Sequence, residues 1–514
     1  MAEAILFPSQ PMFMVDRGWQ RSRKKKRTKN TLRIAESDAQ INGVPEVTIT
    51  IAKPRSAKSR SQTGVPDAQE RNVKVQFRKY EPPLPKTKHV RRSAKQATAG
   101  NTMQPLGQTS TSTANTLHKF DLRHPPVLSS GMTGSSSLLY TVIDPEVSDF
   151  QRFISYYPTR LASALLPVSK HVRFNSNPIQ DIWFPAAMND EVLLHVILFC
   201  SALHQCCMLD YSDFSDSKVL FKVILDRLNR RMQAGRYSDA TIGAISCLAL
   251  CENHLGNHTK WAMHTAGMSE MIQSRGGVAA IPEEMQLKLY RADIIGAVDT
   301  LSSPRLPRPI RTTKSLYHAM NLDIPPNVYL TGELTDADLS PNLFDIFIDL
   351  SYFCQALNVA AKSQIVIDSR AYEEDAFCIQ YDLLTFSGVH LSGVECACRL
   401  AALVFMQSIM KETPFTKTSS GIISRELQHS LRSLEVEREP TSLMFWILIM
   451  GALVSSRTSE KEWYRCMLIR ALESLPDNLA NWRNAKARLQ GILWIESLHD
   501  THGQQLWHEV FGSF

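Results

Sequence analysis

From about residue 140 onward, apolar residues recur at three- and four-residue steps, which is the spacing of one face of an α-helix. The clearest stretch is 256–277, in which five residues share one face of the predicted helix: Trp261, His264, Met268, Met271 and Ile272. Gly267 inside this helix costs about 1 kcal/mol relative to alanine, which indicates that another helix passes close by. Arg275 suits the negative end of the helix dipole. Gly276 and Gly277 are expected to end the helix, because glycine reaches positive φ angles without steric cost.

The same periodicity predicts helices along the whole remaining body. They cover residues 191–208, 217–234, 240–255, 285–301, 338–366, 372–386, 393–410, 421–434, 443–455, 460–475 and 481–495. Prolines between residues 304 and 326 mark a long connector. Sustained period-two alternation is scarce, and we find no fixed repeat of 20 to 50 residues. The pattern therefore predicts an all-α fold, a superhelical array of paired helices, over residues 136–514.

Residues 1–135 have almost no apolar periodicity and are rich in Ser, Thr, Pro, Gln, Lys and Arg. Such a segment cannot bury enough apolar surface to offset its chain entropy, so we expect a disordered arm. The net charge of +7 divides between the two parts, because the arm holds 24 Lys/Arg and 9 Asp/Glu whereas the body holds 33 and 41. A basic arm joined to a mildly acidic body is typical of chains whose arm meets a polyanion or a nuclear import receptor.

The densest basic run lies near the start of this arm. It consists of Arg21, Arg23, Lys24, Lys25, Lys26, Arg27 and Lys29. We interpret the run as a nuclear localisation signal that binds a nuclear import receptor, and it could also make non-specific contacts with nucleic acid phosphates. The alternative is a solvated basic tail without a partner. The first interpretation is favoured because the run is dense and lies in exposed chain, and it predicts a nuclear protein.

None of the ten cysteines precedes Cys200, and their spacing is not that of a secreted disulfide scaffold. Asp16 and Arg17 interrupt the N-terminus early, so we expect no signal peptide. The longest apolar run, residues 443–454, is much shorter than the roughly 20 residues that span a bilayer. We therefore expect a soluble, reduced, intracellular protein without a membrane partner.

Four residues of zinc-ligand type follow one another at helical spacing: Cys247, Cys251, His254 and His258. They would extend over about 16 Å of one helix at 1.5 Å per residue, so one tetrahedral zinc ion cannot bind them all. Core cysteines and ordinary histidines are the favoured interpretation. The same holds for a second group on an apolar helix: His195, Cys200, His204, Cys206 and Cys207. We predict no metal and no cofactor.

Catalytic motifs are missing from the sequence: it contains no nucleophile elbow, no phosphate-binding loop, no G-x-G-x-x-G and no H-E-x-x-H. Glu373, Glu374 and Asp375 are consecutive acids, which point in different directions on a helix. We interpret them as a solvated helix start rather than as an acid/base pair. His264 is interpreted as a core histidine. The sequence therefore predicts no enzyme and no catalytic residue.

Five segments together resemble the regulatory domain of fungal-specific transcription factors, the middle homology region. They are Trp183–Asp190 with the following helix to His204, Trp261–Gly277 with its His264 and Arg-Gly-Gly, Cys396–Ala402, Leu443–Ala452 and Leu506–Val510. Their order fits across roughly residues 140–514. The resemblance implies an all-α superhelical regulatory domain.

The chain departs from that family at its N-terminal side. Relatives with a DNA-binding module carry six cysteines there that hold two zinc ions, and this sequence has none in its first 199 residues. We therefore expect a nuclear, transcription-factor-like regulator without its own zinc cluster, which acts through a DNA-binding partner, through non-specific contacts of its arm, or by sensing a small molecule. The alternative is a protein-interaction scaffold that keeps the helical domain, and an all-α enzyme is the least favoured.

Overall fold

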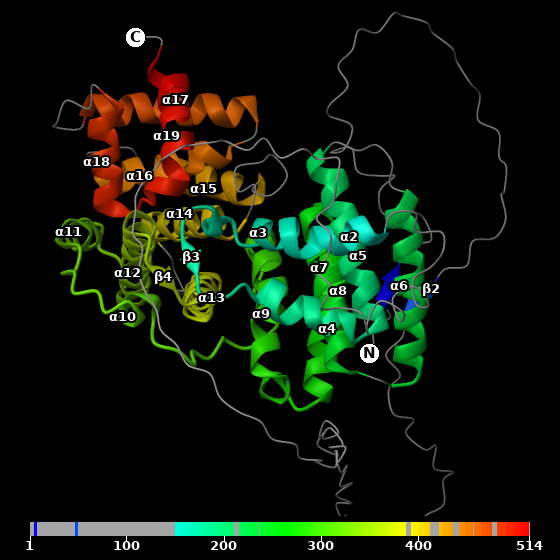
Figure 1. Cartoon of the computed structure of the whole chain (residues 1–514). Coiled ribbons are helices and arrows are strands. Elements are labelled where there is room, and N and C mark those ends of the chain that lie inside the picture. Colours follow the sequence, from blue (N-terminus) through cyan, green and yellow to red (C-terminus); the bar gives the residue numbers. More distant parts are fainter. Residues whose placement is uncertain are drawn as a thin grey trace, which may run out of the picture. The chain divides into compact units, whose positions relative to one another are not determined.

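The computed structural model describes residues 5–7, 47–49, 150–209, 215–235, 237–386, 392–411, 421–434, 441–455, 457–474 and 481–512. All of them belong to one of the two compact units into which the chain divides. Figure 1 shows that the described residues form mainly helices. The all-α class and the array of paired helices are therefore confirmed. The predicted boundary between residues 135 and 136 stays a prediction.

The first part of the body runs from α2 to α9. Its helices are α2 (Phe150–Tyr156), the π-helix η2 (Tyr157–Leu161), α3 (Ala162–Ala164), the 3-10 helix η3 (Pro167–Lys170), the π-helix η4 (Ile179–Trp183), α4 (Phe184–Met188), α5 (Glu191–Leu209), α6 (Ser215–Gln233), α7 (Asp239–His254), α8 (His258–Ser274), the 3-10 helix η5 (Val278–Ala280) and α9 (Glu283–Thr300). The predicted helices of this part are confirmed with small shifts at their ends.

The second part runs from α10 to α19. Its helices are α10 (Leu316–Ala319), α11 (Val328–Asp336), α12 (Pro341–Ser363), α13 (Ser369–Thr385), α14 (Gly393–Met410), α15 (Gly421–Ser433), α16 (Ser442–Val454), α17 (Thr458–Ser474), α18 (Trp482–Ile492) and α19 (Glu496–Phe511). Periodicity alone did not predict α10 and α11, because both are short and lie beside the proline-rich connector.

Four very short strands complete the described elements. Within the predicted arm, β1 (Ile5–Phe7) pairs antiparallel with β2 (Val47–Ile49), in the register Ile5 to Ile49. The hydrophobic pattern did not predict these strands, and the rest of the arm, including the basic run 21–29, lies outside the described residues. The other pair is β3 (Arg173–Phe174) and β4 (Val366–Ile367), which is parallel. It joins two parts of the chain that are almost 200 positions apart.

Side-chain caps explain where many helices begin. Each capping side chain accepts a hydrogen bond from a backbone N–H group of the first turn, which would otherwise have no partner within the helix. The capping residues are Ser238 for α7, Asn327 for α11, Asp368 for α13, Ser392 for α14, Thr441 for α16 and Asn481 for α18. At α14, Glu395 completes a capping box with Ser392.

Consecutive helices pack as pairs: α5 on α6, α7 on α8, α14 on α15 and α16 on α17. Figure 1 shows α9 between α7 and α8 on one side and α13 on the other, in agreement with its contacts. Glycines permit two of the closest approaches. Gly243 on α7 leaves room for the buried Trp183, and Gly451 on α16 leaves room for Tyr464.

Among the residues that the structure describes, helices α12 and α14 are long and apolar enough to cross a membrane. In their most apolar windows, 50% of α12 and 78% of α14 is buried inside the protein. Core helices of a packed protein have the same length and composition. The burial of α14 in particular agrees with a place in the helical core.

Candidate functional site: the buried charges of helix α9

Helix α8 contains the central stretch of the sequence, and its apolar face is buried as predicted. Trp261, His264, Met268, Met271 and Ile272 are all at most 3% exposed. The Trp261 indole donates a hydrogen bond from Nε1 to the carbonyl oxygen of Ala292 on α9, at 2.8 Å. The glycine that allows this contact is Gly296 on α9. Gly267 on α8 is itself buried.

The end of α8 also follows the prediction. The helix stops at Ser274, and Gly276 and Gly277 take φ angles of 104° and 93°. Arg275 forms an ion pair with Asp239 in the first turn of α7 and donates a hydrogen bond to the Tyr237 carbonyl oxygen. The Arg-Gly-Gly segment therefore fixes the end of α8 against the start of α7.

Helix α9 buries four charged side chains, which is the most unusual feature of the described residues. Lys288, Arg291, Asp293 and Asp299 are all at most 6% exposed. Charged residues are rarely buried so fully unless they are paired. The sequence pattern did not predict this burial. One property of the sequence does indicate it: apolar residues lie on every side of this helix. The charged residues between them therefore share no polar face that could remain exposed to solvent.

Arg291 links three parts of the body. Its Nη2 donates hydrogen bonds to the carbonyl oxygens of Leu165, at 2.5 Å, and Met410, at 2.9 Å. Its Nη1 lies 3.9 Å from Oε1 of Glu373 on α13. Burial lowers the pKa of Arg291, and Glu373 partly opposes this effect. Burial also raises the pKa of Glu373 to about 7, although Arg291 acts in the opposite direction.

The three consecutive acids on α13 are buried, so the prediction of a solvated helix start is wrong. Glu373 faces Arg291, as described above. Glu374 accepts hydrogen bonds from the backbone N–H groups of Thr312, at 2.9 Å, and Thr313, at 3.0 Å. Burial alone would raise the pKa of Glu374, but these bonds and those from the threonine hydroxyls lower it.

The third acid, Asp375, accepts a hydrogen bond from the backbone of Leu316 at 2.7 Å and lies 3.0 Å from Arg311. Burial raises the pKa of Asp375 to about 6. The three acids do point in different directions, as expected. Each direction leads to a separate partner, and two of these partners belong to the proline-rich connector.

Asp299, near the end of α9, collects three partners from other elements. It accepts hydrogen bonds from Asn253 on α7 and Gln407 on α14, and it forms an ion pair with Lys411. On the same helix, Asp293 accepts two backbone hydrogen bonds of 2.8 Å from the connector. The buried charges of α9 thus join α7, α13, α14 and the connector through specific bonds.

Lys288 is the remaining charge of this helix, and it lies among thiols and aromatic rings. Its Nζ is 3.4 Å from the Tyr157 hydroxyl oxygen and 4.1 Å from the centre of the Trp183 ring. Burial opposes its charge, but Cys247 and Tyr157 outweigh this effect and keep the pKa of Lys288 above its ordinary value. Lys288 is therefore a cation held mainly by polarisable neighbours.

The zinc-type residues on α7 and α8 separate in the structure. Cys247 and Cys251 are buried, and Sγ of Cys251 lies 3.5 Å from Sγ of Cys200 on α5. His254 is exposed, and Nδ1 of His258 lies 3.2 Å from Oδ1 of Asn253. Across the described ranges, no group of three His, Cys, Asp or Glu side chains could hold a metal ion.

The second group of histidines and cysteines also has individual surroundings. His195 is fully buried, with Nδ1 2.6 Å from the Glu191 carbonyl oxygen. Nδ1 of His204 lies 3.0 Å from the Tyr156 hydroxyl. The core position of His264 is confirmed, and its burial, followed by the charge of Lys260, lowers its pKa to about 3, so this imidazole is neutral at physiological pH.

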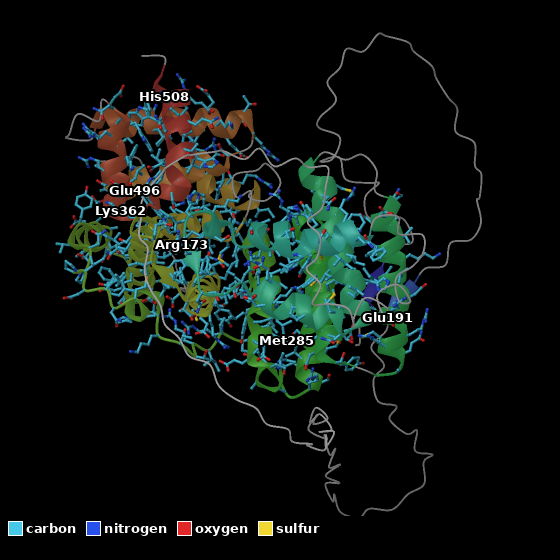
Figure 2. The ribbon with its side chains drawn as sticks, viewed as in Figure 1. Arg173, Glu191, Met285, Lys362, Glu496 and His508 are labelled. Atoms are coloured by element: carbon cyan, nitrogen blue, oxygen red, sulfur yellow. The ribbon has the colours of Figure 1, made fainter. Side chains whose placement is uncertain are left out.

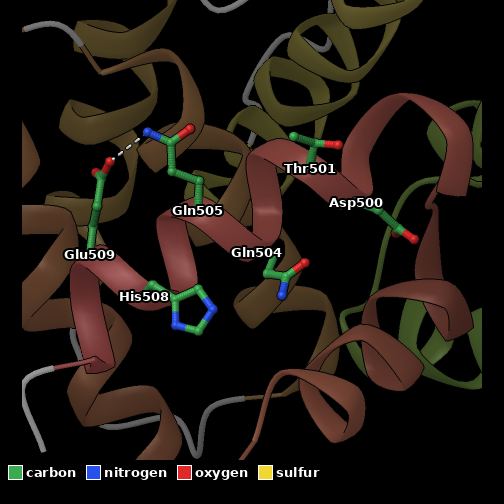
Figure 3. Close-up of a pocket in the computed structure, with 6 residues that line it drawn as sticks. All are labelled: Asp500, Thr501, Gln504, Gln505, His508 and Glu509. Atoms are coloured by element: carbon green, nitrogen blue, oxygen red, sulfur yellow. Dashed lines mark hydrogen bonds between the residues drawn. The ribbon is translucent and has the colours of Figure 1, made fainter.

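Hollows on the described residues offer little enclosure. Figure 3 shows one of them, lined by Asp500, Thr501, Gln504, Gln505, His508 and Glu509, with Gln505 bonded to Glu509 at 3.0 Å. All six residues belong to α19, so no second element among those described closes over a ligand. A smaller cavity of about 230 Å³ lies between α12 and the segment that joins α18 to α19. There the side-chain amide of Asn358 donates a hydrogen bond to the Trp494 carbonyl oxygen and accepts one from the Glu496 backbone N–H. Both polar atoms of this amide therefore already have a partner.

These features define an all-α body whose buried charges bind neighbouring helices. Residues 152–295 match the model of a protein family described as the fungal specific transcription factor domain. This part of the chain is therefore similar to the fungal specific transcription factor domain. No curated protein and no solved structure matches the chain.

The matched range includes the segments around Trp183 and Trp261, so the family resemblance of these two is confirmed. It ends within α9, between Lys288 and Asp299, and the three later segments lie beyond it. Their resemblance stays a prediction. Within the match, the family motifs supply packing residues: Trp183 fills the space over Gly243, and Trp261 fills the space over Gly296.

The pH dependence of stability is expected to reflect Glu252, which is 1% exposed on α7. Burial raises its pKa to about 7 from an ordinary value of 4.5, against weaker effects of Lys260 and Asn257. Because the folded state binds this proton more tightly, the contribution of Glu252 to stability is greatest below about pH 4.5 and declines as the pH rises to about 7. The variant Glu252→Gln should therefore gain stability relative to the wild type between pH 4.5 and 7.5, by on the order of 3 kcal/mol.

Urea unfolding of both proteins across this pH range measures the effect. Glu270→Gln, at an exposed position on α8, is the matched control, and its stability should depend on pH in the same way as that of the wild type. Parallel profiles for Glu252→Gln as well would show that Glu252 does not titrate in this way.

Proposed function

We propose that this chain is a nuclear regulator of transcription of the fungal type, which lacks a zinc cluster of its own and is targeted to DNA by a protein partner. The match of residues 152–295 to the fungal specific transcription factor domain carries this proposal. That domain gives the chain a transcription-regulator-like role. The sequence has no cysteine before Cys200, so the six-cysteine pattern of zinc-cluster relatives has no counterpart in it.

A tethering experiment tests the regulatory part of this proposal. Residues 136–514 are fused to an unrelated DNA-binding domain, and a reporter gene with the matching site is measured in a fungal host. A reproducible rise or fall in reporter output, absent with the DNA-binding domain alone, is the expected result. A fusion that accumulates normally but leaves the reporter unchanged would count against a regulatory body.

The second candidate function is a protein-interaction scaffold that keeps the helical domain without acting on transcription. Isolation of the full chain from nuclei distinguishes the two, because the regulator should be recovered with chromatin at specific loci and the scaffold should not. We propose no catalytic activity. The charged side chains of α9 and α13 contact one another, backbone groups and side chains of neighbouring elements, as a structural network does.

The nuclear part of the proposal depends on the basic run Arg21, Arg23, Lys24, Lys25, Lys26, Arg27 and Lys29. We expect that replacement of Lys24, Lys25, Lys26 and Arg27 with alanine abolishes nuclear accumulation of a fluorescent fusion, because an import receptor recognises clustered cations. Phosphate contacts of this arm would be sensitive to salt and would carry little sequence information.

The matched control replaces four basic residues elsewhere in the arm: Lys86, Lys88, Arg91 and Arg92. This variant removes the same charge and should stay nuclear. Equal nuclear to cytoplasmic ratios for the wild type and the first variant would contradict the assignment of the signal.

A further inference from the structure

Three thiols from two helices meet in the family-matched domain, and the functions proposed above make no use of them. Cys200 belongs to α5, and Cys247 and Cys251 lie one turn apart on α7. Sγ of Cys200 and Sγ of Cys251 are 3.5 Å apart, which is van der Waals contact between sulfur atoms. A disulfide bond has an S–S distance of about 2.05 Å, so the two atoms need to approach by only about 1.5 Å.

The three thiols differ in their access to solvent. Cys200 is half-buried, whereas Cys247 is 3% and Cys251 8% exposed. Cys200 is thus the least buried residue of the three, and we expect a small oxidant from solution to reach it before Cys251. The Lys288 ammonium lies beside this group and favours a thiolate at Cys200 and at Cys247, although burial acts against it. The surroundings thus offer one cysteine that is only partly buried, an adjacent sulfur that can resolve it, and a buried cation.

We propose that Cys200 and Cys251 form a redox modification site, in which a peroxide oxidises the pair to a disulfide that joins α5 to α7. The Cys200 thiolate attacks one oxygen of hydrogen peroxide, the O–O bond breaks, and a sulfenic acid and hydroxide are formed. The Cys251 thiol then attacks the sulfenic sulfur, and its proton leaves with the hydroxyl group as water. In total, two thiols lose two electrons and two protons, and one peroxide becomes two waters.

The surroundings of Cys200 also determine how fast the pair is oxidised. The pKa of Cys200 is well above its ordinary value, because the contact with Cys251 and burial together outweigh the lowering effect of Cys247. Thiolate is the reactive form, so the pair reacts more slowly than an exposed cysteine at neutral pH. The site is therefore suited to sustained oxidation rather than to brief peroxide signals. A reducing cell returns the pair to thiols.

Peptide mapping of the oxidised full-length protein tests this inference. The reduced protein is treated with hydrogen peroxide, remaining thiols are blocked with N-ethylmaleimide, and the protein is digested with trypsin without reduction. Residues 174–218 form one tryptic peptide, which contains Cys200, Cys206 and Cys207. Residues 237–260 form another, which contains Cys247 and Cys251. The expected product is these two peptides joined by a disulfide that dithiothreitol cleaves.

Single variants assign the sulfur atoms. Cys200→Ala and Cys251→Ala should each lose the cross-linked product, whereas Cys247→Ala and the distant, exposed Cys466→Ala should retain it. Circular dichroism establishes that each variant is folded, and the half-buried position of Cys200 makes its variant the safer one. The inference fails if the wild type forms no cross-link while Cys466 is oxidised, or if the cross-link persists in Cys200→Ala or in Cys251→Ala.

Discussion

Replacement of Arg291 with methionine is expected to lower the free energy of unfolding by about 3–5 kcal/mol. The substitution removes hydrogen bonds to the carbonyl oxygens of Leu165 and Met410 and leaves Glu373 buried without its cation. Breaking one side of a buried pair is costly, because the remaining charge keeps its desolvation penalty. Urea unfolding followed by circular dichroism measures the loss.

A double variant tests whether the unpaired acid causes part of this loss. In Arg291→Met/Glu373→Leu the unpaired acid is gone, so part of the lost stability should return. Arg465→Met is the control: its ion pair with Glu462 lies on the surface, and such a pair contributes about 1 kcal/mol or less. An Arg291→Met protein as stable as the Arg465→Met protein would contradict the structural role of the α9 charges.

Gly296→Ala is the second substitution with a large expected effect. A Cβ atom at this position would lie 2.0 Å from Cε2 and 2.2 Å from Nε1 of Trp261. The indole cannot move away freely, because it is 3% exposed and bonded to the Ala292 carbonyl oxygen. We expect a loss of about 3 kcal/mol, the upper part of the usual range for overpacking, measured as a lower urea midpoint.

Gly332→Ala is the matched control, since Gly332 also lies within a helix, α11, and a Cβ there would meet nothing within 4 Å. Alanine has the higher helix propensity, so this variant should gain up to about 1 kcal/mol. A gain of the same size at Gly296 would mean that α8 and α9 do not approach as closely as the structure has them.

Helix positions were predictable because their signals are local. The ends of α14 at Gly393 and Met410 agree with the prediction. The end of α8 follows from the positive φ angles of Gly276 and Gly277, which glycine adopts easily. Buried Trp261 was predictable from the spacing of apolar residues. These features depend on neighbours within one or two turns of the same helix.

The buried charges were not predictable in this way. Glu373 and Arg291 are 82 positions apart, so no spacing within either helix indicates that they meet. A run of three acids on its own is typical of a solvated surface. These acids are buried because α9 and the connector pack against α13 and supply their partners. The contact between Cys200 and Cys251 has the same origin, since it depends on how α5 packs on α7.

The parallel pair β3–β4 has a consequence for how this protein can be divided. Residues 173–174, inside the family-matched range, share hydrogen bonds with residues 366–367, and Asn175 donates a further bond to Asp368 at 2.8 Å. A recombinant fragment that stops at residue 295 would lose these partners and would cut α9 before Asp299. The family-matched range is therefore smaller than the packed body, and a fragment that keeps these partners has to extend at least through Asp368.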